Sequence, residues 1–124
     1  MAQIAAVGVG GFLGSILRYL LSGWVHRTLA SDWFPYGTLA VNVIGCLLIG
    51  FLAGVEEKHA VFTADVRLFI FIGIVGGFTT FSAFAYETVL LARNAQLLTA
   101  FANVLVELTA GLFAVGIGHW LSRF

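Results

Sequence analysis

The residues with the clearest chemical potential lie between positions 73 and 87, which read GIVGGFTTFSAFAYE. Gly76 and Gly77 disfavour a regular helix, and the hydroxyl groups of Thr79 and Thr80 compete for backbone hydrogen bonds, so the stretch predicts an interrupted helix. Because the surrounding residues are apolar enough to span a bilayer, the interruption would leave carbonyl and amide groups without partners in lipid. Such a break survives only inside protein or beside a wet cavity, and it therefore indicates an ion site.

Two phenylalanine residues follow the predicted break directly. Phe81 and Phe84 are three residues apart and share one helical face with Thr88. If the break forms an ion site, these two rings would help to line it. Two aromatic residues at this spacing also occur as ordinary packing or lipid contacts, so the spacing alone leaves both interpretations open.

Polar residues also interrupt the other apolar segments. Thr38 and Asn42 are four residues apart and stack on one helical face. An amide inside a membrane span is costly without partners, so Asn42 either forms interhelical hydrogen bonds or belongs to a polar path. Arg18 lies near the end of the first segment, where its long side chain can extend to the interface or turn inward to a partner.

The last apolar segment carries a polar stripe. Thr99, Asn103 and Glu107 recur every four residues and share one helical face, which Gly111 completes. An ionisable group this deep in a span is a candidate functional residue. A protonated, hydrogen-bonded Glu107 with a structural role is the alternative.

Composition places these residues in a membrane protein. Of 124 residues, 60% are hydrophobic and 10% are charged, against about one quarter charged in soluble domains. The formal net charge is +0 and Lys and Arg do not cluster, so neither nucleic acid nor an anionic lipid surface is an expected partner. No nucleophile is paired with a base or carboxylates, so we do not expect an enzyme.

The elements that must position the polar residues are four transmembrane helices. At about 20 residues per span, the expected spans are 4–23, 37–55, 65–93 and 96–121. The sequence therefore predicts one all-α membrane domain whose third helix is broken in mid-membrane, around 76–80.

The charges in the loops are almost balanced between the two sides of the membrane. Arg27 and Arg93 fall on one side, and Lys58, Arg67 and Arg123 fall on the other. This difference is too small to fix one orientation by the positive-inside rule. A chain that inserts both ways can pair with itself as an antiparallel dimer, which would supply the second wall of a pore.

Three strings together resemble one known family. They are GGFTTFSAF at 76–84, followed by Glu87; GTLAVN at 37–42; and GFLGSILRY at 11–19. The chain resembles the Fluc (CrcB) family of fluoride channels over all four spans. The resemblance implies an antiparallel dual-topology homodimer with two pores, which exports fluoride passively across the inner membrane of a bacterial or archaeal cell.

The resemblance also implies roles for individual residues. Phe81 and Phe84 would meet fluoride with their ring edges, Asn42 would be the pore amide, and Thr38 and Thr80 would offer hydroxyl groups along the path. The carbonyl groups of Gly76 and Thr79 from both subunits would hold a structural sodium ion, which is not transported. Arg18 and Glu87 match charged positions of the family pattern and are vestibule or structural candidates.

The fourth helix departs from the family pattern, which places a track of hydroxyl groups along the pore. Aligning Gly116 and Gly118 without gaps puts Glu107 and Gly111 at those positions. We therefore place Glu107 and its stripe-mate Asn103 on the fluoride pathway. A charged carboxylate would repel fluoride, so we expect Glu107 to be a protonated donor, with neutralisation by Arg18 as the alternative.

Two other functions fit a small four-helix membrane protein. A dual-topology, proton-coupled multidrug exporter uses a membrane carboxylate in its first helix, but residues 4–23 contain none. A non-transporting assembly subunit would use its glycines only for packing, and it would leave the helix break and both polar stripes unexplained. We therefore expect the channel.

Overall fold

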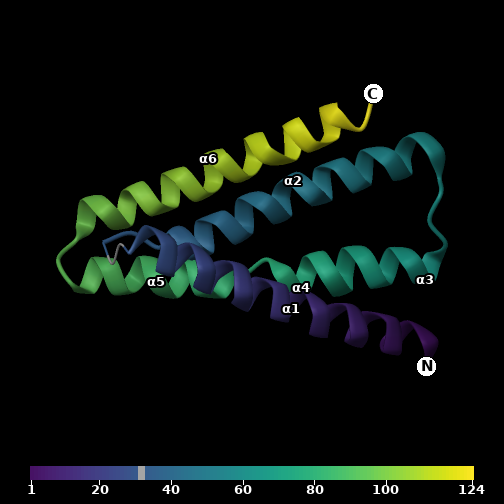
Figure 1. Cartoon of the computed structure of the whole chain (residues 1–124). Coiled ribbons are helices and arrows are strands. Elements are labelled where there is room, and N and C mark those ends of the chain that lie inside the picture. Colours follow the sequence, from purple (N-terminus) through teal and green to yellow (C-terminus); the bar gives the residue numbers. More distant parts are fainter. Residues whose placement is uncertain (31–32) are drawn as a thin grey trace.

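The computed structural model describes residues 1–30 and 33–124, and all regular secondary structure in these ranges is helical (Figure 1). The elements are α1 (Ala2–Leu29), α2 (Tyr36–His59), α3 (Ala64–Arg67), η1 (Leu68–Val75), α4 (Gly76–Phe78), α5 (Phe81–Arg93) and α6 (Leu97–Leu121). Within the described residues, four segments are long and apolar enough to cross a membrane: Ala2–Leu29, Tyr36–His59, Ala64–Arg93 and Leu97–Leu121. The predicted all-helical class with four membrane-length helices is confirmed.

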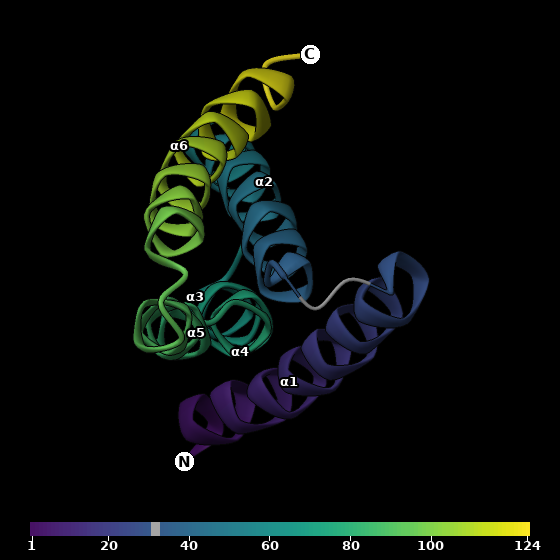
Figure 2. The ribbon, with the colours of Figure 1, turned by 90° about the vertical axis from the view of Figure 1, so that its left-hand side faces the viewer.

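The helices form two packed pairs. α2 and α6 lie side by side and run in the same direction, and α1 lies across the third membrane-length segment, mainly along η1 and α4 (Figures 1 and 2). α1 and α2 continue to Leu29 and His59, beyond the predicted spans of 4–23 and 37–55. Helical hydrogen bonding continues into the polar residues that follow each apolar stretch.

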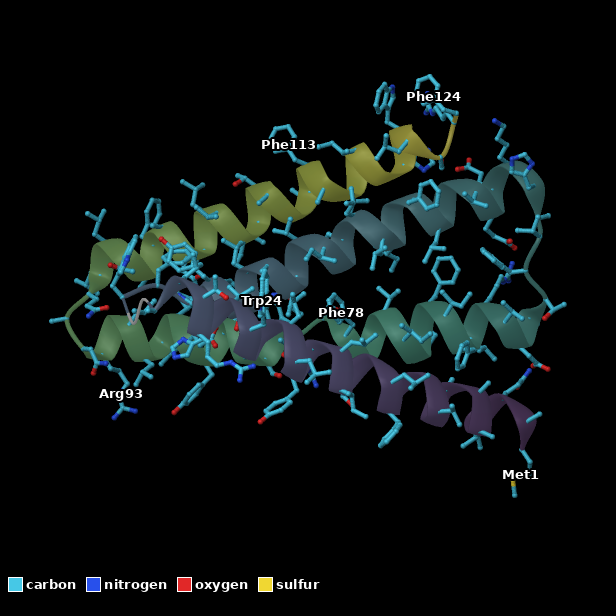
Figure 3. The ribbon with its side chains drawn as sticks, viewed as in Figure 1. Met1, Trp24, Phe78, Arg93, Phe113 and Phe124 are labelled. Carbon is cyan, nitrogen blue, oxygen red and sulfur yellow. The ribbon has the colours of Figure 1, made fainter. Side chains whose placement is uncertain are left out.

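Large apolar side chains cover the outside of the molecule, while small and polar residues fill the helix contacts. Phe113 points away from α6 and is 72% exposed, whereas Phe78 lies between the helices (Figure 3). The buried residues of α6 are Ala100, Asn103, Glu107, Gly111, Ala114 and Gly118. This distribution is the one expected in lipid, where packing and hydrogen bonds hold helices together because apolar burial gives little advantage.

Glycine residues bring α1 against the third segment. A Cβ atom on Gly73 would lie 2.8 Å from the Cα atom of Gly10, and one on Gly77 would lie 2.9 Å from the carbonyl oxygen of Gly11. The two backbones therefore meet without intervening side chains. Close approach is the main role of these glycines, as the small residues of membrane helices commonly show.

The helix break is shorter than the sequence predicted and excludes the two glycines. Gly76 and Gly77 are helical, in α4, and only Thr79 (φ −81°, ψ 160°) and Thr80 (φ −150°, ψ 112°) are extended. Glycine costs a helix about 1 kcal/mol. At Gly77 close packing against Gly11 of α1 offsets that cost, whereas a Cβ atom at Gly76 would meet, among the described residues, only the Phe71 carbonyl oxygen, at 3.4 Å. Thr80 starts α5 because its hydroxyl oxygen accepts the Ala83 N–H at 3.2 Å. The depth of the break in the membrane stays a prediction.

A second irregularity has no counterpart in the sequence analysis. The eight residues of η1 form a π-helix, and at its end the Gly76 N–H reaches the carbonyl oxygen of Phe71, five residues earlier. A π-helix is rare and is frequently found at functional sites. It lies here immediately before the break, on the segment that packs against α1.

Gly14→Ala tests the close packing of α1. A Cβ atom there would collide with the carbonyl oxygen of Ile74 and lie 2.8 Å from the Phe78 nitrogen. We expect a loss of about 1–3 kcal/mol in stability, the usual cost of overpacking. The measurement is the temperature at which detergent-solubilised protein ceases to elute as one species. Gly8→Ala is the control, because a Cβ atom at Gly8 meets nothing within 4 Å; equal melting of both variants would refute the packing role.

Candidate ion pathway

All four main-chain polar groups of the break have partners within the chain. The Thr79 N–H donates to the Val75 carbonyl at 3.0 Å, and the Thr79 carbonyl accepts from Arg18 Nη1 at 3.2 Å. The Thr80 N–H donates to Asn42 Oδ1 at 2.9 Å, and the Thr80 carbonyl accepts from Asn42 Nδ2 at 3.2 Å. The Asn42 side chain thus replaces the helical partners that Thr80 lacks.

Arg18 turns inward, which is one of the two orientations that the sequence left open. Besides its bond to Thr79, it lines a cavity of about 350 Å³ together with Thr38, Thr80 and Glu87. Arg18, Ser22 and His26 are spaced by four residues and share the face of α1 toward this region. Sequence reasoning missed Ser22 and His26, although this spacing was available to find them.

Asn42 also reaches α6. Its Nδ2 atom lies 3.4 Å and 3.2 Å from the two carboxyl oxygens of Glu107, with Asn42 as the donor. Of the two roles that the sequence left open, the interhelical bond is therefore present. The amide joins α2, the break and α6, and both of its N–H groups have acceptors.

Phe81 and Phe84 form an aromatic pair at the start of α5. Their ring centroids are 5.5 Å apart and the ring planes meet at 59°. Phe84 is 8% exposed, whereas Phe81 is 76% exposed on the outside of the chain. Both rings line a cavity of about 310 Å³ that also reaches Asn42, Thr80 and Glu107. The structure thus brings together residues from α2, α5 and α6 that the sequence predicted separately.

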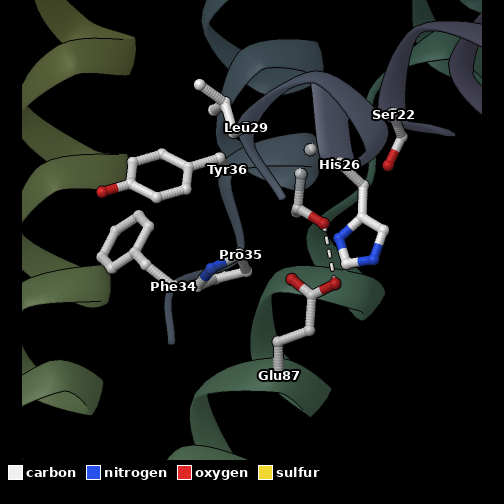
Figure 4. A pocket seen from close by; sticks show the side chains of 9 residues that line it. Ser22, His26, Leu29, Phe34, Pro35, Tyr36 and Glu87 are labelled. Carbon is white, nitrogen blue, oxygen red and sulfur yellow. Dashed lines mark hydrogen bonds between the residues drawn. The ribbon is translucent and has the colours of Figure 1, made fainter. Parts of the chain in front are cut away.

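Glu87 occupies a second polar region. The Thr38 hydroxyl donates to Glu87 Oε1 at 2.8 Å, and His26 lies beside this pair in a cavity of about 110 Å³ (Figure 4). Glu87 Oε2 is buried and has no hydrogen-bond partner among the described residues. Glu87 also lines the cavity of about 350 Å³ beside Arg18, and Thr80 lines both that cavity and the cavity of the aromatic pair. Thr80 is therefore the link between the two regions.

Asn103 lies apart from these cavities. It is fully buried, and its Nδ2 atom donates to Thr88 Oγ1 at 2.8 Å. Its neighbour on the polar stripe, Glu107, is also buried but faces the cavity of the aromatic pair.

The two residues predicted to bind sodium through their carbonyl groups differ in conformation: Gly76 is helical and Thr79 is extended. Among the described residues, no three His, Cys, Asp or Glu side chains form a group that could hold a metal ion.

Asn42→Ala tests the role of the amide at the break. Removing it leaves the Thr80 N–H and carbonyl without partners, at about 1–3 kcal/mol each. We expect lower thermal stability and faster hydrogen exchange confined to residues near Thr80. Asn94→Ala is the control, because Asn94 is exposed at the end of α5. Unchanged exchange at Thr80 in the Asn42 variant would contradict the assignment.

The chain matches known proteins over almost its whole length. Residues 5–119 match the family model described as CrcB-like protein, Camphor Resistance (CrcB). A Syntrophotalea carbinolica protein named fluoride-specific ion channel FluC is 44% identical over 121 residues, covering 98% of both chains. A Clostridium perfringens protein of the same name is 42% identical over 117 residues, covering 94% of this chain and 91% of the relative. Fluoride-specific ion channel FluC 1 of Methanosarcina acetivorans is 37% identical over 118 residues, covering 95% and 88%. With four membrane-length helices, this chain is a multi-pass membrane protein that belongs to the CrcB family.

Proposed function

We propose that this protein is a fluoride channel that lets the ion leave the cytoplasm down its gradient. The names of its relatives support this function, and one geometric observation carries it. Phe81 and Phe84 line one cavity together with Asn42 and Glu107, directly beside the helix break. An aromatic pair, a buried carboxyl group and hydroxyl groups around a membrane cavity suit a small anion better than an organic substrate.

The proposed route passes from the cavity of Glu87 to that of the aromatic pair. Thr80 links the two, and Thr38 lies near the entrance, where its hydroxyl group donates to Glu87. Fluoride is strongly hydrated, so the protein must replace water with donors and with the electropositive edges of aromatic rings. Weak neutral partners suit conduction, because binding must also be easy to reverse.

Glu107 fits this route as a carboxylic acid. A carboxylate 4 Å from fluoride would repel it by about 4 kcal/mol at an effective dielectric near 20. Glu107 is 8% exposed and receives a hydrogen bond from Asn42, and among the described residues no Lys or Arg forms an ion pair with it. One oxygen would accept from Asn42 while the protonated oxygen donates to the ion.

An antiparallel dual-topology homodimer completes the proposal, with two pores per dimer. Phe81 is 76% exposed, whereas Phe84 is buried within its own chain. A second copy would cover the exposed ring of Phe81. The balanced charges of the loops support insertion in both orientations. The lipid bilayer is then the common environment of both copies.

A structural sodium ion at the dimer centre is part of the same proposal. The Thr80 N–H donates to Asn42, so the Gly76 carbonyl lacks its usual helical donor, and the Thr79 carbonyl keeps one lone pair besides its bond to Arg18. These neutral oxygen acceptors fit a hard cation. Gly76 and Thr79 of both copies would hold the ion, which would join the two breaks.

A proton-coupled multidrug exporter is less favoured. α1 contains no Asp or Glu, whereas that mechanism uses a carboxylate in the first helix. The helix break and the aromatic pair would also have no role in it.

Efflux from liposomes tests the function. Reconstituted protein should release trapped fluoride, read by a fluoride electrode, and should not release chloride. Phe81→Ile and Phe84→Ile should abolish or strongly reduce fluoride efflux, because an aliphatic side chain lacks an electropositive edge. Phe113→Ile, on the exposed face of α6, is the control and should conduct normally. Normal efflux in both pathway variants would remove the aromatic pair from the pathway.

Glu107→Gln tests the protonated donor. Glutamine keeps an N–H donor and cannot ionise, so fluoride efflux should persist and should no longer fall at high pH, where the wild-type carboxyl group loses its proton. Glu107→Ala should slow efflux at every pH because it removes the donor. The donor role is wrong if glutamine is as inactive as alanine, or if wild-type efflux is independent of pH.

A further inference from the structure

Asn103 and Thr88 form a hydrogen-bonded relay between α6 and the aromatic pair. Asn103 Nδ2 donates to Thr88 Oγ1 at 2.8 Å, and Thr88 Oγ1 donates to the carbonyl oxygen of Phe84 at 2.7 Å. A hydroxyl group has one proton to donate. Because Thr88 accepts from Asn103, its own proton is directed to Phe84.

The burial of this relay makes its bonds consequential. Asn103 is fully buried and Phe84 is 8% exposed. In such an environment hydrogen bonds polarise one another, and water cannot replace a lost partner. A threonine hydroxyl bonded to the carbonyl four residues earlier also bends a helix slightly. The relay therefore fixes both the local path of α5 at Phe84 and its position against α6.

Asn103 lines neither the cavity of the aromatic pair nor the cavity shared by Arg18, Thr80 and Glu87. One N–H is bound to Thr88, and Oδ1, an acceptor, is buried without a partner among the described residues. An acceptor oxygen repels fluoride, so this environment suits a structural link better than an ion contact.

We propose that Asn103 and Thr88 are positioning residues that hold the Phe84 ring in place for fluoride. This inference rests on the proposed function. Instead of contacting the ion, as expected from the sequence, Asn103 affects conduction by holding Phe84. The Phe81 and Phe84 ring centroids are 5.5 Å apart, so a shift of the α5 backbone at Phe84 changes the spacing of the pair and with it the fit to a small ion.

The test uses full-length protein in liposomes, with fluoride efflux and the fluoride-to-chloride ratio as readouts. Thr88→Val keeps the shape of the side chain and removes the hydroxyl, and Asn103→Leu replaces the amide by an apolar side chain of similar volume. Each should slow fluoride efflux by roughly threefold to tenfold, the range that one lost neutral hydrogen bond gives, and each should lower the ion ratio. The double variant should be no worse than the poorer single variant, because both remove the same relay.

Two further variants separate positioning from general stability. Thr88→Ser keeps the hydroxyl and should restore most of the efflux. Thr109→Val removes the same type of bond, from Thr109 Oγ1 to the Leu105 carbonyl at 2.7 Å, on an exposed part of α6, and should conduct as wild type. If Asn103→Leu does not assemble, Asn103→Ala takes its place under the same criteria.

The proposal is overturned if Thr88→Val keeps the wild-type efflux and ion ratio, if Thr88→Ser is as slow as Thr88→Val, or if the losses in the double variant add. Loss of assembled protein in all the apolar relay variants also counts against it, since the pair would then serve folding alone. Phe84→Ile is measured in parallel. Normal efflux in Phe84→Ile would refute the pathway role of the ring, whereas an inactive Phe84→Ile beside a normal Thr88→Val would refute only the relay.

Discussion

The structure depends on one constraint, which is that a main-chain polar group in apolar surroundings needs a partner. Extended residues at Thr79 and Thr80 remove helical partners in the middle of a membrane-length segment. Arg18 and Asn42 supply replacements from two other helices. The break is therefore a tertiary feature, since α1 and α2 must both be in place before it is satisfied.

Close backbone packing makes those replacements possible. The glycines of α1 bring it against η1 and α4 without intervening side chains, as the approach of Gly10 to Gly73 shows. Arg18 follows two turns later on the same helix and reaches the Thr79 carbonyl. The packing of α1 and the chemistry of the break are thus coupled, and a change that separates the backbones also withdraws the guanidinium group.

Several polar side chains around the break hold one another by hydrogen bonds. Asn42 holds Thr80 and Glu107, Thr38 holds Glu87, and Asn103 holds Thr88. In a medium that strengthens every electrostatic interaction, a fixed unpaired charge would trap an ion or exclude it. The proposed pathway relies on shared hydrogen bonds and aromatic rings, and the guanidinium group of Arg18, which lines it, is bound to the Thr79 carbonyl.

Composition and spacing alone predicted the all-helical class, the four membrane-length segments and an interruption in the third. These features are local: apolar runs of sufficient length must be helical in lipid, and two threonines after a glycine pair weaken a helix. Local propensity also misassigned the break to Gly76 and Gly77. A glycine that packs against another backbone, as Gly77 does against Gly11, has the same sequence signal as one that ends a helix.

Only the tertiary structure decided which polar residues meet. The spacing placed Asn42, Asn103 and Glu107 on helical faces, but it could not show that Asn42 binds Thr80 and Glu107 while Asn103 binds Thr88. The inward turn of Arg18 and the π-helix of η1 were equally hidden. A helical face is fixed by the chain's own periodicity, whereas its partner is fixed by the rotation and approach of another helix, which depend on packing between residues far apart in the sequence.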